Sequence, residues 1–162
     1  MALAYAGRYA TTRARLADYL RRKIAERGWV EDGTVATDGE VARIVRRFVE
    51  LGYVDDRAVA EARARSMAAR GYGARRLDGV LGSLGIGEQD AEGARRDAAE
   101  GAWEAALRFA KRRRIGPFAE REVDDAGRRR AFAAMMRAGH PVDLARRILS
   151  ASPGDVPSWD DP

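Results

Sequence analysis

The chain has 162 residues, of which 46% are hydrophobic, and a formal net charge of +5 at pH 7. It contains no cysteine, which excludes a disulfide scaffold and a Cys-ligated metal site and fits a reducing compartment. No apolar run approaches the roughly 20 residues of a membrane span, and the N-terminal residues lack the pattern of a signal peptide. These features predict a cytoplasmic protein that does not enter a membrane.

Abundant alanine and arginine, both good helix formers, predict an all-α fold. Hydrophobic periodicity, interrupted by glycine and proline, places nine helices along the chain. We expect these helices at 2–10, 13–27, 40–51, 56–69, 74–84, 88–100, 102–113, 124–137 and from Pro141 onward. The polar segment 30–39 is expected to be a loop, because it contains glycine and no periodic pattern.

The clearest local pattern lies between residues 41 and 59. Its first half has the apolar stripe of an amphipathic helix, formed by Val41, Ile44, Val45, Phe48 and Val49. Gly52 is expected to end this helix in the left-handed conformation, with Tyr53 packed on Phe48 as in a Schellman motif. The next helix is expected to bury a face formed by Val59, Ala62, Ser66 and Met67.

Carboxylates and one hydroxyl stand at the predicted helix starts. The pairs Asp55-Asp56 and Asp124-Asp125 are expected to cap backbone N–H groups, in preference to forming a metal site or an acid–base pair. Thr37 and Glu40 have the spacing of a capping box. The sequence therefore gives these acidic residues a role in architecture.

The nine helices fall into three successive groups of three. The second helix of each group ends in glycine followed by a residue able to pack, in the pairs Gly28-Trp29, Gly85-Ile86 and Gly139-His140. This recurrence predicts three tandem three-helix repeats that form an elongated, curved array. The expected boundaries are 2–54, 55–101 and 102–150, followed by a disordered acidic tail at 151–162. His140, the only histidine, is expected to pack in the core.

Arginine accounts for 28 of the 30 basic residues, and its planar guanidinium suits phosphate or carboxylate contacts. Paired basic residues recur along the helices and could align into a stripe that fits a phosphate backbone or another acidic groove. Each pair could equally be the solvated face of its helix. Residues 111 to 114 carry the strongest local charge. The candidate partner-binding residues are Arg21, Arg22, Arg46, Arg47, Arg75, Arg76, Lys111, Arg112, Arg113, Arg114, Arg128 and Arg129.

An ordered set of short motifs over residues 2–150 resembles the RecX family of regulators of the bacterial recombinase RecA. The motifs are Ala2-Leu3-Ala4-Tyr5, Thr12-Arg13-Ala14-Arg15-Leu16, Leu51-Gly52-Tyr53-Val54-Asp55-Asp56 with Ala60-Glu61, Gly71 with Leu77, Leu84-Gly85-Ile86, Lys111 to Arg114, Arg129-Arg130 with Phe132, Arg137-Ala138-Gly139-His140 and Ile148-Leu149. The chain departs from the family pattern in a longer segment at 24–39, in Arg15 where the family has Glu, and in Ala74 where it has Pro.

The resemblance implies three tandem three-helix repeats and a non-enzymatic role. Members of the family bind the RecA–DNA filament along its groove and dampen strand exchange, ATP hydrolysis and co-protease activity. By this resemblance the chain acts as a monomer in DNA repair, recombination and the SOS response. Its partners would be the RecA filament and single- or double-stranded DNA, contacted through phosphates. No cofactor is expected.

Two other functions are considered from the residues. Three-helix units are also typical of helix-turn-helix proteins, so the chain could be a DNA-binding protein or transcriptional regulator that acts without a recombinase. A hydrolytic enzyme is disfavoured, because a single histidine, no cysteine and no nucleophile–base spacing leave no catalytic constellation. A metal site built from several histidines is excluded on the same count.

Overall fold

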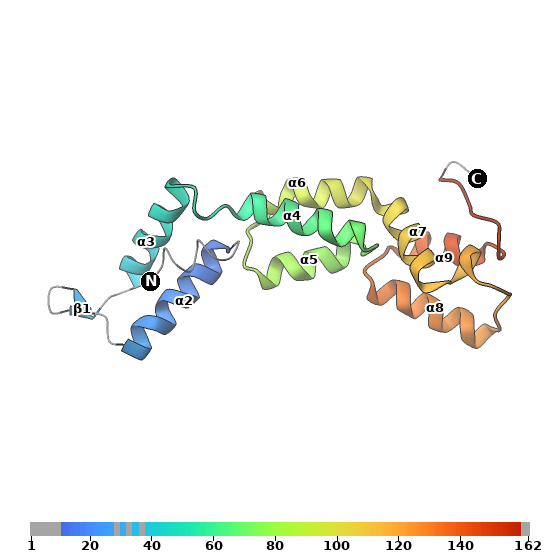
Figure 1. Cartoon of the computed structure of the whole chain (residues 1–162), viewed down its shortest axis with the longest axis horizontal. Helices are drawn as coiled ribbons and strands as arrows, with labels where there is room; N and C mark the ends of the chain where they lie inside the picture. Colours follow the sequence, from blue (N-terminus) through green and yellow to red (C-terminus); the bar gives the residue numbers. More distant parts are fainter. Residues whose placement is uncertain (1–10, 28–29, 32–33, 36–37, 160–162) are drawn as a thin grey trace. The chain divides into compact units, whose positions relative to one another are not determined.

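The computed structural model describes residues 11–27, 30–31, 34–35 and 38–159. The predicted all-α class is confirmed: the described residues form eight α-helices, a short 3-10 helix and a minimal hairpin (Figure 1). The helices are α2 Arg13–Arg27, α3 Asp38–Glu50, α4 Asp56–Ala69, α5 Ala74–Ser83, α6 Glu88–Glu100, α7 Ala102–Arg113, α8 Asp125–Arg137 and α9 Val142–Ser150, with the 3-10 helix η1 at Gly116–Phe118. None of the helices in these ranges is long and apolar enough to cross a membrane. The predicted helix 2–10, the pair Gly28-Trp29 and the cap Thr37 lie outside the described residues.

The predicted loop at 30–39 is partly wrong. Strands β1 (Val30–Glu31) and β2 (Thr34–Val35) form an antiparallel pair in which Val30 faces Val35 and Glu31 faces Thr34. The sequence Asp32-Gly33 between them belongs to the strongest short hairpin signals, which the polar composition of the segment obscured. The hairpin connects α2 to α3.

The described chain divides into two compact units. Unit 1 contains the described residues up to Glu61 together with Leu81–Ala91, and unit 2 contains Ala62–Val80 together with the described residues from Glu92 onward. Helices α4, α5 and α6 therefore each contribute residues to both units. The division into three repeats and their arrangement as one array stay predictions.

The core of unit 1 forms between α2 and α3. Its buried side chains are Leu16, Leu20, Val41, Val45 and Val54, and Tyr19, Ile24, Ile44 and Phe48 pack against them. The predicted stripe of α3 is confirmed for its first four positions. The prediction is wrong for Val49, which is 37% exposed near the end of the helix.

A Schellman motif ends α3 as predicted. The N–H of Tyr53 donates to the carbonyl of Phe48 and that of Gly52 to Val49, both at 2.9 Å, and Gly52 has φ +73°. The ring centres of Phe48 and Tyr53 are 5.7 Å apart. The same two hydrogen bonds end four further helices, at Gly71-Tyr72, Arg114-Ile115, Gly85-Ile86 and Gly139-His140. This repeated ending sets the turn into the following segment.

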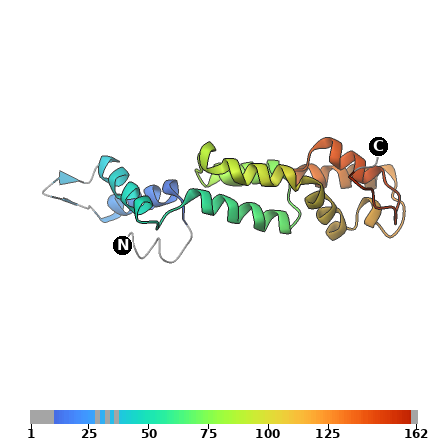
Figure 2. The same cartoon turned by 90° about the horizontal axis from the view of Figure 1, so that it is seen from above.

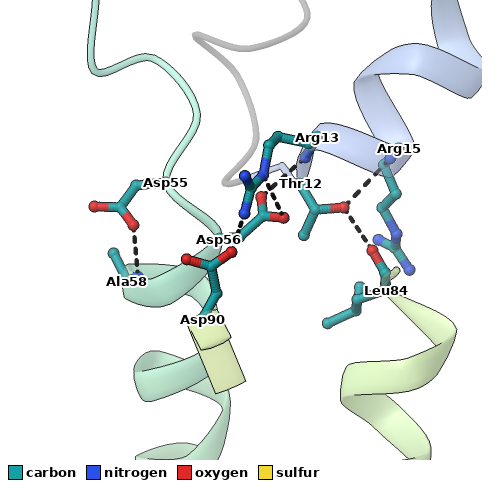
Figure 3. Close-up of polar contacts among 8 residues, drawn as sticks. All are labelled: Thr12, Arg13, Arg15, Asp55, Asp56, Ala58, Leu84 and Asp90. Atoms are coloured by element: carbon teal, nitrogen blue, oxygen red, sulfur yellow. Dashed lines mark hydrogen bonds and ion pairs between the residues drawn. The ribbon is translucent and has the colours of Figure 1, made fainter. Parts of the chain in front are cut away.

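Asp55 and Asp56 have different roles, which corrects the prediction that both cap α4. Asp55 is the cap: its Oδ1 accepts the N–H of Ala58 at 2.9 Å (Figure 3). Asp56 is buried and turns toward α2, where its two carboxylate oxygens accept from the backbone N–H of Arg13 at 2.9 Å and from Arg13 Nε at 3.1 Å. Asp56 thus forms a tertiary contact with a residue 43 positions earlier, and Asp55 alone caps α4.

The same junction ties α2 to α5 and α6 within unit 1. Arg13 also forms an ion pair with Asp90 at the start of α6 (Figure 3). The hydroxyl of Thr12 donates to the carbonyl of Leu84 at 2.7 Å and accepts the N–H of Arg15 at 3.3 Å, so it caps α2 while bonding to the end of α5. Residues of two separate sequence motifs, at 12–16 and 51–56, thus meet in one network.

The core of unit 2 is built by α7, α8 and α9. It buries Trp103, Ala106, Phe109, Ala110, Ala134, Met135, Ala138, Leu144, Ala145 and Ile148. The predicted face of α4 is wrong in two positions: Ala62 and Ser66 are exposed, while Ala60, Ala64 and Met67 are buried. Alanine on several sides of this helix gives little contrast between its faces, so tertiary packing decides which one is covered.

The predicted disorder of the tail is wrong over residues 151–159. The N–H of Gly154 donates to the carbonyl of Pro117 at 2.8 Å, and Arg147 donates to the carbonyl of Ser158 at 2.9 Å. The ring centres of Trp159 and Trp103 are 5.7 Å apart. The segment lies beside the helices of unit 2 (Figure 2), because Trp159 finds an aromatic and a guanidinium surface there.

Candidate functional site

The predicted basic candidates divide by whether a carboxylate neutralises them. Five of them, all on exposed surface, have a carboxylate partner within 4.0 Å: Arg21 with Asp38 and Asp18, Arg22 with Glu26, Arg47 with Glu50, Arg114 with Glu120, and Arg128 with Asp125. The hydrogen bond to Asp38 raises the pKa of Arg21, and that to Asp125 raises the pKa of Arg128. These five side chains are therefore engaged within their own units.

The other seven candidates form no ion pair with a carboxylate in the described part of the chain. They are Arg46, Arg75, Arg76, Lys111, Arg112, Arg113 and Arg129, and all of them are exposed. Arg46 lies on α3 in unit 1, and the remaining six lie in unit 2. A single basic stripe through all of them stays a prediction.

Three of these candidates converge with two further arginines around Tyr72. The guanidinium carbon lies 4.6 Å from the Tyr72 ring centre for Arg76, 5.4 Å for Arg112 and 5.7 Å for Arg70. Arg113 and Arg137 line a hollow of about 160 Å³ together with Tyr72 and Arg76. We call Arg70, Arg76, Arg112, Arg113 and Arg137 the Tyr72 arginine cluster.

Helix ends bring the cluster together. Tyr72 follows Gly71 in the Schellman ending of α4, Arg76 lies in the first turn of α5, and Arg112 and Arg113 lie in the last turn of α7. Arg137 is the last residue of α8. Each arginine is far from most of the others in sequence, so only the packing of α4, α5, α7 and α8 creates the cluster.

A close backbone approach fixes this packing. The N–H of Gly73 donates to the carbonyl of Ala138 at 2.9 Å, and that of Arg75 to Gly139 at 3.2 Å. A Cβ atom at position 73 would lie 2.3 Å from the Gly139 carbonyl oxygen, a separation that real Cβ atoms do not adopt. Glycine at 73 therefore allows the start of α5 to touch the end of α8.

Part of the cluster has a structural role. Arg76 Nη1 donates to the carbonyl of Arg137 at 3.2 Å, and Arg112 Nη1 donates to the carbonyl of Arg70. Cations at the C-terminal ends of helices stabilise unpaired carbonyls and the helix dipole. Each guanidinium carries several N–H donors, so donors remain for another acceptor. In the described chain the side chains of Arg113 and Arg137 have no hydrogen-bond partner at all.

The run from Lys111 to Arg114 does not act as one patch. Arg112 and Arg113 belong to the cluster, whereas Arg114 leaves the helix with φ +52° and pairs with Glu120 at 3.1 Å. Arg114 takes the left-handed position that glycine occupies in the other endings. Sequence reasoning missed Arg70, Tyr72 and Arg137. The available signal was that arginine precedes the Gly71 break directly and the Gly139 break two residues earlier.

His140 lies under the cluster and packs as predicted. It is fully buried, and its ring centre lies 5.4 Å from that of Phe109. Its Nε2 is 3.1 Å from the carbonyl oxygen of Gly71, which fits an Nε2–H donor. Burial lowers the pKa of His140 below the ordinary 6.5. Across the described residues no group of three or more His, Cys, Asp or Glu side chains is placed to hold a metal ion.

Comparisons by sequence and by structure both find known proteins that are similar to this chain. The regulatory protein RecX of Myxococcus xanthus (strain DK1622) is 30% identical over 171 aligned residues, which cover 94% of this chain and 83% of the relative. The crystal structure of RecX from Lactobacillus salivarius superimposes with a TM-score of 0.64 at 19% identity, covering 92% of this chain and 90% of that one. No family model matches the chain.

The name of the Myxococcus relative places the protein among regulatory proteins. The Lactobacillus structure shows that it shares their helical fold. The identity to the Myxococcus protein extends over nearly the whole chain, well beyond any single motif. The chain belongs to the RecX family. This confirms the resemblance seen in its sequence motifs.

Proposed function

We propose that the chain binds the filament that the RecA recombinase forms on DNA and inhibits it. Binding would reduce strand exchange, ATP hydrolysis and co-protease activity, and so modulate DNA repair, recombination and the SOS response. The chain acts in the cytoplasm as a monomer, needs no cofactor and performs no chemistry of its own. Membership of the RecX family supports this role.

The observation that carries the proposal at residue level is the Tyr72 arginine cluster. Five cationic side chains from four helix ends gather where the described chain supplies no carboxylate within 4.0 Å. A filament of recombinase on DNA offers long rows of phosphates and acidic side chains, and arginine binds either group through paired hydrogen bonds. The cluster is thus the part of the described surface best suited to an acidic partner.

The test measures ATP hydrolysis by RecA on single-stranded DNA as this protein is added. Because one inhibitor bound to a filament affects many recombinase subunits, we expect slower hydrolysis at sub-stoichiometric amounts. Unchanged hydrolysis at a one-to-one ratio would exclude the proposal. A sequence-selective shift of duplex DNA without recombinase would instead support a helix-turn-helix type of regulator.

A further inference from the structure

Arginine side chains already surround the ring of Tyr72 at the centre of the cluster. Three guanidinium carbons lie between 4.6 and 5.7 Å from the Tyr72 ring centre, within the range of cation–π contacts. Aromatic side chains in single-strand-binding proteins instead offer a free face on which bases stack. Tyr72 therefore holds arginines where such proteins would hold bases.

The charge of the cluster is uncompensated within the part of the chain that the structure describes. The hollow is lined by Tyr72, Arg76, Phe109, Arg113, Ala134, Arg137 and Ala138, with no acidic residue among them. Like charges held this close repel one another, so an anion that binds between them is favoured. The guanidiniums of Arg113 and Arg137 have all their donors available for it, because neither side chain has a partner in the described chain.

The surroundings of the cluster favour phosphates over an acidic protein segment. Hot spots of protein–protein interfaces are enriched in Trp, Tyr and Arg, and their aromatic side chains bury in a pocket of the partner. The exposed large apolar residues of the described chain are Val49, Leu51, Tyr53, Val123, Val156 and Trp159, and none of them belongs to the cluster. A surface that is strongly positive and carries no exposed large apolar side chain is typical of nucleic-acid contacts.

We propose that the Tyr72 arginine cluster binds the phosphodiester backbone of nucleic acid without contacting the bases, and that Tyr72 orders the guanidiniums. The proposal rests on the proposed function in that the nucleic acid of the filament is the expected target. It adds which residues make the phosphate contacts and that they leave the bases uncontacted. Binding should then be independent of base sequence.

The direct probe is a labelled deoxyribose-phosphate oligomer without bases, compared with an oligothymidylate of equal length, in the absence of recombinase. Base stacking on an aromatic residue contributes about 1–3 kcal/mol per base. Since the proposal assigns no stacking, we expect the full-length protein to bind both oligomers with dissociation constants within about twofold. Binding of the base-free oligomer at least about tenfold more weakly would overturn it.

A double variant tests the residues. Arg113→Ala with Arg137→Ala removes two cations whose side chains form no hydrogen bond or ion pair in the described chain, so we expect the fold to be retained, which circular dichroism checks. On single strands the slope of log K against log salt should fall by about 1.4, because each lost phosphate contact contributes about 0.7. The matched control is Arg63→Ala with Arg96→Ala, which removes the same charge from exposed positions on α4 and α6. An equal fall in both variants would contradict the assignment.

Two further measurements separate the alternatives. Polyglutamate should displace the oligomer only weakly; displacement as effective as by unlabelled oligomer would mean that the site takes carboxylates, and would overturn the proposal. The ATP hydrolysis assay is read separately. If the wild type inhibits RecA but does not bind the base-free oligomer, this inference fails while the proposed function stands. If the wild type binds the base-free oligomer but does not inhibit RecA, the proposed function fails while this inference stands.

Discussion

His140 makes the stability of unit 2 depend on pH. Its Nε2–H donates to the Gly71 carbonyl, and its Nδ1 is buried with no hydrogen-bond partner in the described chain. Protonation would place a charge in the core and turn Nδ1 into a donor without an acceptor, and burial therefore lowers the pKa of His140. The unfolded chain then binds a proton more readily than the folded chain does.

The expected result is a loss of stability as the pH falls through the ordinary pKa of 6.5. The free energy of unfolding is largest above this pH and decreases below it by up to about 1.4 kcal/mol per pH unit, until the lowered pKa of the folded state is reached. Urea unfolding between about pH 7.5 and pH 5.5 measures this, in a window where Asp and Glu titrate little.

The control is His140→Gln, whose amide can donate to the same carbonyl but does not titrate. We expect this variant to have a flatter dependence of unfolding free energy on pH over the same window. Because the chain has a single histidine, no other imidazole contributes. Identical pH dependence in the variant and the wild type would contradict the assigned role of His140.

At the scale of the elements, Asp56 holds α2 on α4. The side chain of Asp56 is 2% exposed and that of Arg13 is 45% exposed, so the ion pair is only partly buried. Asp56→Asn keeps the shape but weakens both hydrogen bonds from Arg13, and we expect it to lower the free energy of unfolding by about 1–3 kcal/mol. Chemical denaturation measures the change.

Asp18→Asn is the matched control for this substitution. Asp18 also pairs with an arginine, Arg21, but both side chains lie on the surface. Exposed ion pairs contribute little to stability, so we expect no measurable change. An Asp56 variant as stable as the Asp18 variant would show that the junction of Figure 3 does not stabilise the fold.

Two glycines, Gly73 directly before α5 and Gly79 inside it, give a second contrast. A Cβ at Gly73 would overlap the Gly139 carbonyl, whereas a Cβ at Gly79 meets nothing within 4 Å. Gly73→Ala should therefore destabilise the protein by about 1–3 kcal/mol. Gly79→Ala should stabilise it by about 0.5–1 kcal/mol through helix propensity. Thermal unfolding of both variants compares them, and two shifts of the same sign would be incompatible with the close approach of α5 and α8.

Elements with a local cause could be predicted from the sequence. The ends of α2, α4, α6 and α7 lie where periodicity and glycine breaks place them, and the caps at Asp55 and Asp124 bond to neighbours three residues away. Contacts across long separations could not be predicted. Asp56 looked like a cap because its partner lies 43 residues earlier, and the face of α4 depended on neighbouring helices.

The candidate site could be predicted only in part for the same reason. Paired arginines were visible in the sequence, but five of the candidates are paired with carboxylates that come from a neighbouring turn or another element. The cluster joins arginines from the ends of α4, α7 and α8 and from the start of α5 with an aromatic residue that no charge pattern marks. Convergence of this kind is a property of packing.

At the scale of the whole molecule, the proposed function depends on how net charge is distributed. The chain carries +5, yet ion pairs occupy many of its arginines in both units. In unit 2 the Tyr72 arginine cluster brings together five arginines that form no ion pair in the described chain. Under the proposed function no pocket for chemistry is needed, because a surface that binds an acidic filament would be sufficient to alter it.

The most direct test of the central claim is the dose that halves ATP hydrolysis by RecA on single-stranded DNA. For Arg113→Ala with Arg137→Ala we expect this dose to rise at least about tenfold, since loss of two charge-assisted contacts costs 1.4 kcal/mol or more. The Arg63→Ala, Arg96→Ala control should need a dose close to that of the wild type. Equal doses for the wild type and both variants would contradict the claim that the Tyr72 arginine cluster carries the regulation.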